Sequence, residues 1–504
     1  MVKLFKSTWG DVFSLIAGVL LTLSFSPFDI SLLAFIALAT LNLTLSSVIG
    51  AKRATLRGFL FGLGLFGSGV SWVFVSMVVG EHSGLFLPIL MTLFYCVFWA
   101  LFPAISAYFF IKLRANSYVD CLVFSCVWVF VEYIRGEWIF GGFPWLQIGY
   151  SQLDCYLLAG YIPIFGVYGV GLIIAMISAL LADSLWCKNT RSKAIIGVTA
   201  LLLVGAVLKN INWTDGSGGP IKVTLIQGNI AQKDKWQLEN RNTTLKQYYD
   251  DSVKHWASDI IIWPETAIPA YYTDVKDGYL MPLEAEAIAH NTTIITSLPY
   301  KDEFEQLYNS VLTLGESHDL YKKIHLLPFG EYLPWQPLSG HVLGLMDIRL
   351  GKFNPGEIDQ SLLKAAGHYF VTSICYEDAF GEQNIRYIEQ AEFLVNVTND
   401  GWFDGSIEPY QHLQIARMRA LESGRYLLRA TNTGVTAVVS DKGKIIHQAP
   451  VMQRASITAD IKPMSGLTPY ARIGDKPVIV LIVLLLLGGL FNKYYLMKKL
   501  ARLV

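Results

Sequence analysis

The chain has 504 residues, of which 53% are hydrophobic and only 16% are charged, and its mean hydropathy is +0.41. This composition is too apolar for an ordinary soluble enzyme and indicates a membrane protein. The formal net charge is zero, so the composition gives no reason to expect binding to nucleic acid.

Eight apolar runs are long enough to be interpreted as membrane-spanning helices. They lie at about 10–26, 30–49, 58–80, 85–111, 118–135, 157–182, 194–209 and 477–496. The first run, which follows Lys3 and Lys6, also allows a signal peptide, but no small-residue cleavage site comes after it. We therefore expect a seven-span region over 1–209, a polar domain over 210–476, and an eighth span with a short tail over 477–504.

Basic residues in the short connections predict the orientation of the spans. Lys and Arg cluster before the first span, after the second, fourth and sixth spans, and after the eighth, whereas the alternate connections hold almost none. With eight spans, every basic connection lies on one side, so both termini are expected in the cytoplasm and residues 210–476 outside it. The basic residues that flank that domain do not follow the excess of Lys and Arg in cytoplasmic connections: Lys209, Arg472 and Lys476. Long domains cross the membrane largely regardless of their charge, so these residues do not change the expected orientation.

The polar domain begins with "TDGSGGP" (214–220), a composition typical of a flexible linker. After it, apolar strand-like runs such as "IKVTLIQ" (221–227), "DIIIWPE" (259–265) and "EFLVNVT" (392–398) alternate with helix-like stretches such as 408–424. This alternation predicts an α/β domain in which helices cover sheets.

One of the six cysteines, Cys375, lies in this polar segment, at the end of the predicted strand "HYFVTSI" (368–374). Thiols outside the cytoplasm usually pair as disulfides, so a cysteine without a partner in its domain is a candidate reactive thiol. The alternative is that Cys375 is a small core residue at a strand end.

A nucleophilic thiol needs a base and a group that stabilises the thiolate or the developing oxyanion. Glu265 ends a buried strand, where desolvation should raise its carboxyl pKa and suit it to act as a base. Lys322 and Lys323 lie on a predicted strand in "YKKIHLLPFGE" (321–331), so only one of them can point into a sheet interface. The alternatives are an acid at a helix N-terminus and two solvated edge lysines.

Two histidines in the domain, His325 and His412, raise the alternative of a Cys–His pair, but neither lies in a distinctive local motif. The sequence contains no H-E-x-x-H, C-x-x-C or glycine-rich phosphate motif. Neither a metal nor a nucleotide cofactor is therefore expected.

The motifs "WPE", "YKKIHLLPFGE" and "CYED", in that order, resemble the nitrilase superfamily with its Glu–Lys–Cys triad, and the resemblance covers nearly all of 220–460. Four further motifs and the eight apolar runs narrow the resemblance to the apolipoprotein N-acyltransferase family of Gram-negative bacteria, along the full chain. These motifs are "GGFPW" (141–145), "QGNIAQKDKW" (227–236), "NDGWF" (399–403) and "RALESGRYLLRATNTG" (419–434).

The resemblance implies an αββα nitrilase-like sandwich on the periplasmic side of the cell inner membrane, attached to an eight-span helical bundle. It implies a phospholipid acyl donor and, as acceptor, an apolipoprotein whose S-diacylglyceryl cysteine carries a free α-amine. The implied reaction passes through a thioester acyl-enzyme and is the last step of lipoprotein maturation. A monomer without a cofactor is expected, and both substrates are lipids or lipid-anchored.

Carried over by position, the resemblance makes Glu265 the general base, Lys323 the oxyanion stabiliser and Cys375 the nucleophile. Glu331 matches the family's supporting second glutamate. The remaining matches are, around the acyl pocket, Trp236, Tyr376 and Glu377, and, as a supporting acid and base, Glu422 and Arg425.

Two other functions stay open on the sequence alone. One is a membrane-tethered amidase of nitrilase type that hydrolyses a soluble C–N bond. The other is a transporter or sensor whose outer domain only binds a ligand. A transporter should carry ionisable residues within its spans, whereas here there are few, and Asp11 and Glu132 lie near span ends, which argues against it.

Overall fold

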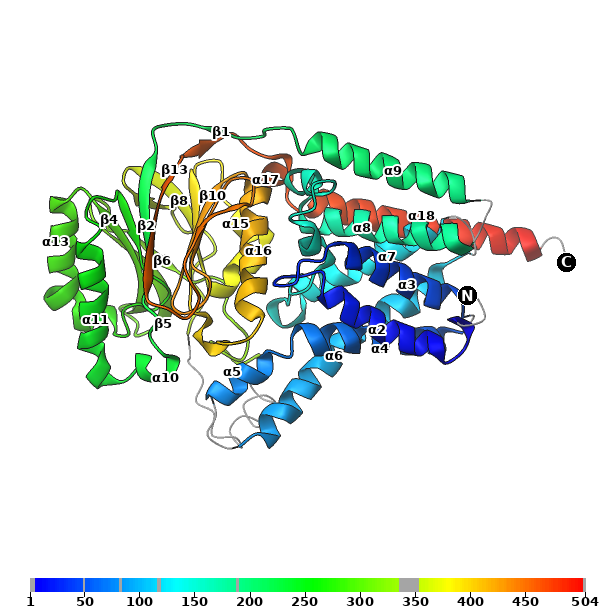
Figure 1. The fold of residues 1–504 in the computed structure, drawn as a ribbon, viewed down its shortest axis with the longest axis horizontal. Coiled ribbons are helices and arrows are strands. Elements are labelled where there is room, and N and C mark those ends of the chain that lie inside the picture. Colours follow the sequence, from blue (N-terminus) through cyan, green and yellow to red (C-terminus); the bar gives the residue numbers. More distant parts are fainter. Residues whose placement is uncertain are drawn as a thin grey trace. The chain divides into compact units, whose positions relative to one another are not determined.

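The computed structural model describes residues 5–48, 50–80, 84–115, 119–186, 190–334 and 353–501. The chain forms two compact units, each of which is described by itself (Figure 1). The helical unit comprises Met1–Val78, His82–Ile211 and Ile473–Val504, and the α/β unit comprises Val79–Glu81 and Asn212–Arg472.

Apolar helices make up the helical unit. In the described ranges they are α2 (Trp9–Thr22), α3 (Leu32–Ser46), α4 (Ala51–Gly69), α5 (Val73–Gly80), α6 (Phe86–Leu113), α7 (Asp120–Glu137), α8 (Ile162–Trp186), α9 (Arg191–Leu208) and α18 (Lys476–Ala501). Among the described residues, α6, α8, α9 and α18 are long and apolar enough to cross a membrane, and α4 and α5 make a fifth span if the pair, bent by 48°, is counted as one. By length and composition, four or five of the eight expected spans are therefore supported.

Close helix packing and satisfied buried charges hold the helical unit together. A Cβ on Gly18 would lie 2.0 Å from the Phe61 carbonyl oxygen, so only glycine allows α2 to approach α4 this closely. Arg57 on α4 is completely buried, and it donates to Asp11 Oδ1 at 2.9 Å and to the Thr44 carbonyl oxygen at 2.6 Å. A charge inside an apolar unit needs partners of this kind.

The α/β unit contains two six-stranded sheets. The first has the order β13 (Ala455–Ile461), β2 (Ile221–Gln227), β3 (Ile260–Ile262), β4 (Thr293–Lys301), β5 (Leu307–Leu314) and β6 (Leu320–Lys322). The second has the order β12 (Ile445–Gln448), β11 (Ala437–Val439), β10 (Tyr426–Thr431), β9 (Phe393–Thr398), β8 (His368–Ile374) and β7 (Leu363–Ala365). The central strands β2, β3 and β4, and likewise β8, β9 and β10, run parallel.

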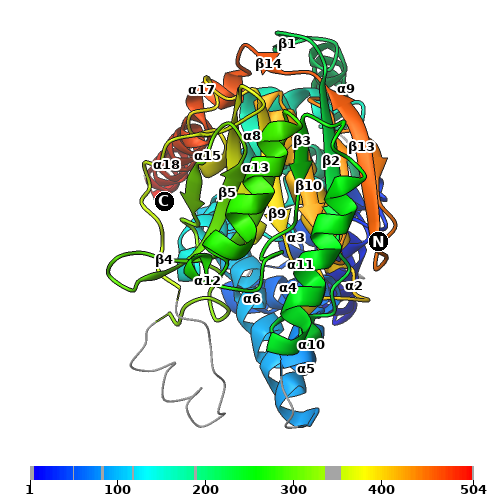
Figure 2. The same ribbon diagram turned by 90° about the vertical axis from the view of Figure 1, so that its left-hand side faces the viewer.

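The sheets pack face to face with helices outside both. Alternate residues of a strand point to opposite faces, so Leu225 of β2 packs in the core between the sheets and Ile226 packs under the outer helices. Figure 2 shows α11 (Leu238–Val253) and α13 (Met281–Ala289) in front of the first sheet. The second sheet carries α16 (Glu408–Ser423). This four-layer arrangement confirms the predicted αββα sandwich.

Two details of local structure bear on the sequence predictions. The helix expected over 408–424 is α16, and Gly424 ends it in a left-handed conformation (φ 66°), which glycine adopts without strain. The segment 214–220 was expected to be a flexible linker, but Asp215 and Gly216 form β1, which pairs with β14 (Met464–Ser465). The linker prediction is therefore wrong for these residues, because backbone pairing with a distant segment orders them.

Candidate active site

The first part of the site follows strand β3. The chain leaves β3 through Trp263, whose backbone N–H donates to the Ile295 carbonyl oxygen at 2.8 Å. Pro264 comes next and has no backbone N–H with which to continue the strand pairing. This places Glu265 beyond a strand end with 8% of its surface exposed. Its Oε1 accepts a 2.8 Å hydrogen bond from the side-chain amide of Asn309 on β5.

Lys323 follows the edge strand β6 directly, and only 1% of its surface is exposed. Its Nζ lies 2.8 Å from Glu331 Oε2, and its backbone N–H donates to the Asn309 carbonyl oxygen at 2.8 Å. Asn309 also donates to Glu331 Oε1 at 3.0 Å, so one amide group joins the carboxylates of Glu331 and Glu265. We call Glu265, Lys323 and Glu331 the carboxylate–lysine cluster.

The two neighbouring lysines point in opposite directions. Lys322 lies with its Nζ 4.2 Å from the centroid of the Tyr308 ring, while Lys323 points inward to Glu331. This is the alternation that a strand imposes on successive side chains.

Cys375 lies where β8 passes into a short 3₁₀ turn, Cys375–Ala379. Its φ of +51° is in the left-handed region, which is uncommon for a residue with a Cβ and marks a sharp, constrained turn. Cys375 is partly exposed, although Ile374 and Tyr376 on either side are buried, and it forms no disulfide. The turn therefore leaves Cys375 partly exposed while it buries the residues on either side.

Burial and charge set the protonation of these groups. Burial raises the pKa of Glu265, and Lys323 partly offsets that rise. For Lys323, burial disfavours the charge, but Glu331 and Glu265 outweigh it and the pKa is raised, so the ammonium persists. Burial and the Glu265 charge raise the pKa of the Cys375 thiol well above its usual value. The thiol is thus protonated near neutral pH and needs a base to become a nucleophile.

Glu377 connects the two halves of the site. It is completely buried, and its Oε2 accepts a 2.7 Å hydrogen bond from the Ile374 N–H, just before Cys375. Its Oε1 accepts a 2.7 Å hydrogen bond from the Ile324 N–H, just after Lys323. Glu377 therefore supports the backbone at both positions.

Trp236 and Tyr376 differ in exposure, and Tyr376 belongs to an aromatic group at the turn. Trp236 follows the short helix α10 (Gln232–Lys235) and is 52% exposed, whereas Tyr376 is 5% exposed. His325 stacks on Phe380 with ring centroids 3.6 Å apart, and the Tyr376 ring centroid lies 5.9 Å from that of His325. The described ring contacts of His325 thus place it in an aromatic group.

Glu422 and Arg425 lie at the far end of α16. Arg419 Nη1 lies 3.2 Å from Glu422 Oε2, and the described contacts of Arg425 are hydrogen bonds to backbone carbonyl oxygens. Burial lowers the pKa of Arg425 to about 10. His412, near the start of the same helix, is ten residues before Glu422, which is about 15 Å along the helix axis at 1.5 Å per residue. Among the described polar contacts of these three residues, that of His412 reaches Cys375, and those of Glu422 and Arg425 do not.

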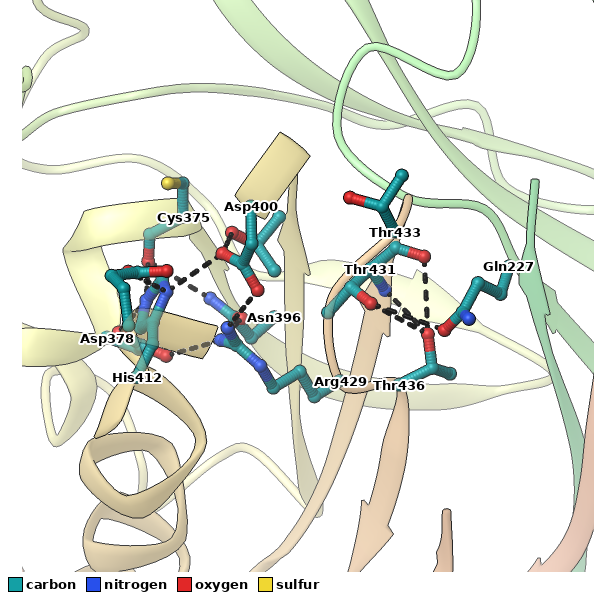
Figure 3. Close-up of polar contacts among 12 residues, drawn as sticks. Gln227, Cys375, Asp378, Asn396, Asp400, His412, Arg429, Thr431, Thr433 and Thr436 are labelled. Carbon is teal, nitrogen blue, oxygen red and sulfur yellow. Dashed lines mark hydrogen bonds and ion pairs between the residues drawn. The ribbon is translucent and has the colours of Figure 1, made fainter. Parts of the chain in front are cut away.

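A second polar cluster underlies the Cys375 turn (Figure 3). His412 places Nε2 3.0 Å from Asp378 Oδ1 and Nδ1 3.1 Å from Asp400 Oδ1. Arg429 spans the same two acids, at 3.0 Å from Asp378 and 3.2 Å from Asp400. All four side chains are at most 1% exposed. We call Asp378, Asp400, His412 and Arg429 the ion-pair network.

The ion-pair network joins the turn after β8, which holds Cys375 and Asp378, to the turn after β9, which holds Asp400. Burial and Arg429 lower the pKa of His412, but Asp378 and Asp400 outweigh them and raise it to about 10. His412 Nε2 also lies 3.4 Å from the Cys375 carbonyl oxygen. The network was not expected from the sequence, although Asp378, Asp400 and Arg429 lie inside three of the motifs quoted above.

One group among the described residues has the composition and spacing of a metal site: ligand atoms of Asp400, Glu408 and His412 lie within 4.8 Å of one another. The charges of this group are balanced without an ion. The Arg429 guanidinium lies 3.2 Å from Asp400, and His412 Nε2 is paired with a further acid, Asp378. Burial and Asp400 raise the pKa of Glu408 well above its usual value, which favours its neutral form. We therefore interpret the group as part of a buried ion-pair network.

The sandwich has the nitrilase-like fold of the carbon–nitrogen hydrolase family. Residues 222–470 match the Carbon-nitrogen hydrolase family model, and residues 17–180 match the Apolipoprotein N-acyltransferase N-terminal domain model. The solved structure of Saccharomyces cerevisiae Nit3, a member of branch 10 of the nitrilase superfamily, aligns at 19% identity with a TM-score of 0.39, over 49% of this chain and 93% of that one.

Full-length relatives identify the particular family. An apolipoprotein N-acyltransferase of Methylococcus capsulatus is 44% identical over 92% of this chain and 93% of its own. Those of Nitrosomonas europaea and Coxiella burnetii are each 39% identical, over 94% and 95% of this chain and 95% and 99% of their own. The chain belongs to the apolipoprotein N-acyltransferase family, and it is an acyltransferase that acts in lipoprotein N-acylation.

Proposed function

We propose that the chain moves a fatty acyl group from a phospholipid to the N-terminal amine of the S-diacylglyceryl cysteine of an apolipoprotein, through a thioester on Cys375. One observation above all supports this proposal. Cys375 is a partly exposed residue on a constrained turn, and Glu265 and Lys323 both act on the pKa of its thiol, so all three groups lie within electrostatic range. A thiol, a carboxyl of raised pKa and a buried ammonium are the groups that acyl transfer needs.

In the first half of the proposed reaction, Cys375 Sγ attacks the carbonyl carbon of the phospholipid ester while Glu265 takes the thiol proton. The negative charge that develops on the carbonyl oxygen is stabilised by Lys323 Nζ and a backbone N–H. The ester C–O bond then breaks, and Glu265 returns the proton to the leaving alkoxide. Lysophospholipid departs and the acyl group remains on Cys375 as a thioester.

In the second half, the α-amine of the apolipoprotein attacks the thioester carbon and Glu265 takes a proton from the attacking nitrogen. The C–S bond breaks, the amide forms, and the Cys375 sulfur regains its proton. No water is consumed and no oxidant is required, so the cycle is balanced. Glu331 and Glu377 support Lys323 and Cys375, and Trp236 and Tyr376 lie in the acyl-binding region.

The same proposal covers topology and assembly. Eight spans, both termini in the cytoplasm, and a catalytic domain over 210–476 on the periplasmic side of the inner membrane agree with the distribution of basic residues. A helical unit in the same chain suits an enzyme whose two substrates both reside in the membrane. All proposed catalytic groups come from one chain, so a monomer suffices.

Incubation with phospholipid alone tests the proposal. Intact mass should reveal a stable fatty-acyl adduct on Cys375 and at most one equivalent of lysophospholipid. A site that excludes water does not hydrolyse the thioester, so the acyl-enzyme waits for a lipid-anchored amine held beside it. Addition of a diacylated lipopeptide with a free amine should restart turnover, whereas its N-acetylated form should not.

Two outcomes contradict the acyltransferase mechanism. Hydrolysis of phospholipid over many turnovers without an acceptor would indicate a lipase-like enzyme. Cleavage of a soluble amide without any acyl acceptor would support the amidase that the sequence left open.

A further inference from the structure

A second buried lysine, Lys235, lies beside Glu265 and takes no part in the steps above. It is the last residue of α10 and only 3% of its surface is exposed. Its Nζ donates a 3.0 Å hydrogen bond to the main-chain carbonyl oxygen of Glu265. Lysine is almost never fully buried without a charge partner. Lys233 on the same helical turn is exposed, so burial is particular to Lys235.

Among Glu265 and the charged groups that act on its pKa, the positive and negative charges are equal in number only when Lys235 is included. Glu265 and Glu331 contribute two carboxylates, whereas the Lys323 ammonium, 2.8 Å from Glu331, contributes one positive charge. Lys235 supplies the second positive charge, beside Glu265. An uncompensated buried carboxylate is costly and tends to take up a proton instead.

We propose that Lys235 is a positioning residue that keeps Glu265 ionised and holds its main chain in place, so that Glu265 can accept first the thiol proton and then the amine proton. This inference rests on the proposed role of Glu265 as the base. It adds to that role a second lysine, distinct from the oxyanion-stabilising Lys323.

The groups that face Glu265 act in opposite directions on its pKa. Burial has the largest effect and raises it, and Glu331 raises it further, whereas Lys323, the Asn309 hydrogen bond and Lys235 lower it. Loss of the Lys235 charge therefore raises the pKa of Glu265, and a larger fraction of the base is protonated in mildly acidic solution.

Lys235 itself remains charged where this matters. Burial lowers its pKa to about 8, against the opposing effects of Glu265 and the Cys375 sulfur, so the ammonium predominates at neutral and acidic pH. The effect of removing it should consequently be greatest on the acidic limb of the rate profile, which reports the base in the free enzyme.

The experiment measures the rate of acyl-enzyme formation from phospholipid alone, in the full-length protein, from about pH 5.5 to about pH 9. Lys235→Met removes the charge, and Lys235→Gln removes the charge but keeps a donor for the Glu265 carbonyl. Both should lose on the order of tenfold in rate at mildly acidic pH, with a smaller loss above neutrality, because a neighbouring opposite charge is gone. Lys235→Arg should restore the wild-type profile, and Lys233→Met is the matched exposed control.

Three outcomes overturn the inference: an acidic limb at the wild-type pH in both Lys235→Met and Lys235→Gln, a rate loss that is equal at every pH, or a shifted limb in Lys233→Met. The wild type and Glu265→Gln separate this inference from the proposals on which it rests. If the wild type forms no acyl-enzyme from phospholipid, the proposed function itself fails, and if Glu265→Gln still forms it at the wild-type rate, the role of Glu265 as the base fails. If Glu265→Gln is inactive and the acidic limb of the rate profile lies at the wild-type pH in Lys235→Met and Lys235→Gln, only the role of Lys235 fails.

Discussion

Two buried polar clusters lie at the strand ends of the α/β unit, one in each sheet, and they differ in what their charges can do. In the carboxylate–lysine cluster, burial raises the pKa of Glu265, so a proton can be taken up and released there. In the ion-pair network, the acids hold His412 protonated, with its pKa raised to about 10, and Arg429 spans the same acids.

This difference shows how similar residue types serve two purposes. Two acids that form ion pairs with two bases in closed geometry stay fully charged and join two turns. Glu265 differs in that Lys235 binds its main-chain carbonyl oxygen and not its carboxylate, while burial raises the pKa of the carboxyl and suits it to proton transfer. We therefore expect variants in the carboxylate–lysine cluster to lose rate and variants in the ion-pair network to lose stability.

The largest expected effect is at Cys375, which lies above the ion-pair network and within range of Glu265. Cys375→Ala should reduce N-acylation of a lipopeptide by at least about a thousandfold, as removal of a nucleophile does in comparable enzymes. The circular dichroism spectrum and the midpoint of thermal unfolding should stay unchanged, because little volume is lost. Substantial residual activity would refute the assignment of the nucleophile.

Glu331→Gln tests the carboxylate–lysine cluster. The substitution keeps the shape of the side chain but removes the charge 2.8 Å from Lys323 Nζ, so the ammonium is no longer held in place. The rate of acyl-enzyme formation should fall on the order of a hundredfold, as misplacement of a catalytic group by about 1 Å does. A large loss of thermal stability with a normal rate per folded molecule would mean that Glu331 stabilises the fold and does not serve catalysis.

His412→Gln tests the ion-pair network. It leaves Asp378 and Asp400 buried with one cation fewer, and breaking a buried pair in this way costs about 3–5 kcal/mol. The thermal unfolding of the purified full-length protein should show this loss, while the rate per folded molecule should change less than in Glu331→Gln. His447→Gln, at an exposed position on β12, is the matched control. Equal stability of the two variants would argue against a structural network.

The contribution of His412 should also depend on pH. The folded-state pKa is raised, so the contribution is complete below the ordinary histidine pKa of about 6.5 and is lost as the pH rises through about 10. The stability difference between wild type and His412→Gln should therefore be largest in mildly acidic solution and should shrink in alkali. A difference that grows with pH would mean that His412 is buried in its neutral form.

The smallest effect on activity is expected from two introduced cysteines. They test on which side of the membrane the two polar clusters lie. Ser217→Cys and Ser192→Cys both place a thiol at an exposed position, the first in the α/β unit and the second in α9. A membrane-impermeant maleimide applied to intact spheroplasts should label the first and not the second, against the background of the wild-type cysteines. The opposite pattern would place the clusters in the cytoplasm.

Residue patterns in the sequence predicted a membrane protein with an α/β domain and the candidate residues Glu265 and Cys375, with one of Lys322 and Lys323 pointing inward. The class of protein, the αββα sandwich and the choice of Lys323 came from the resemblance to a known family. Apolar runs reveal what must be buried, and the period-2 alternation of strands reveals that only one of two adjacent lysines can point inward. Strand ends are also recognisable, because Pro264 and the acids after Cys375 stop the apolar pattern. These signals depend only on neighbouring residues, so they can be recognised in one sequence without a structure.

Only the tertiary structure identified the partners. Asn309 joins Glu265 to Glu331 from a neighbouring strand, Lys235 reaches Glu265 from a helix 30 residues earlier, and His412 and Arg429 connect turns in different parts of the second sheet. It also placed Glu422 and Arg425 at the far end of α16. Such contacts depend on which strands pair and how the sheets stack, and periodicity specifies the face of an element but not the residue opposite it.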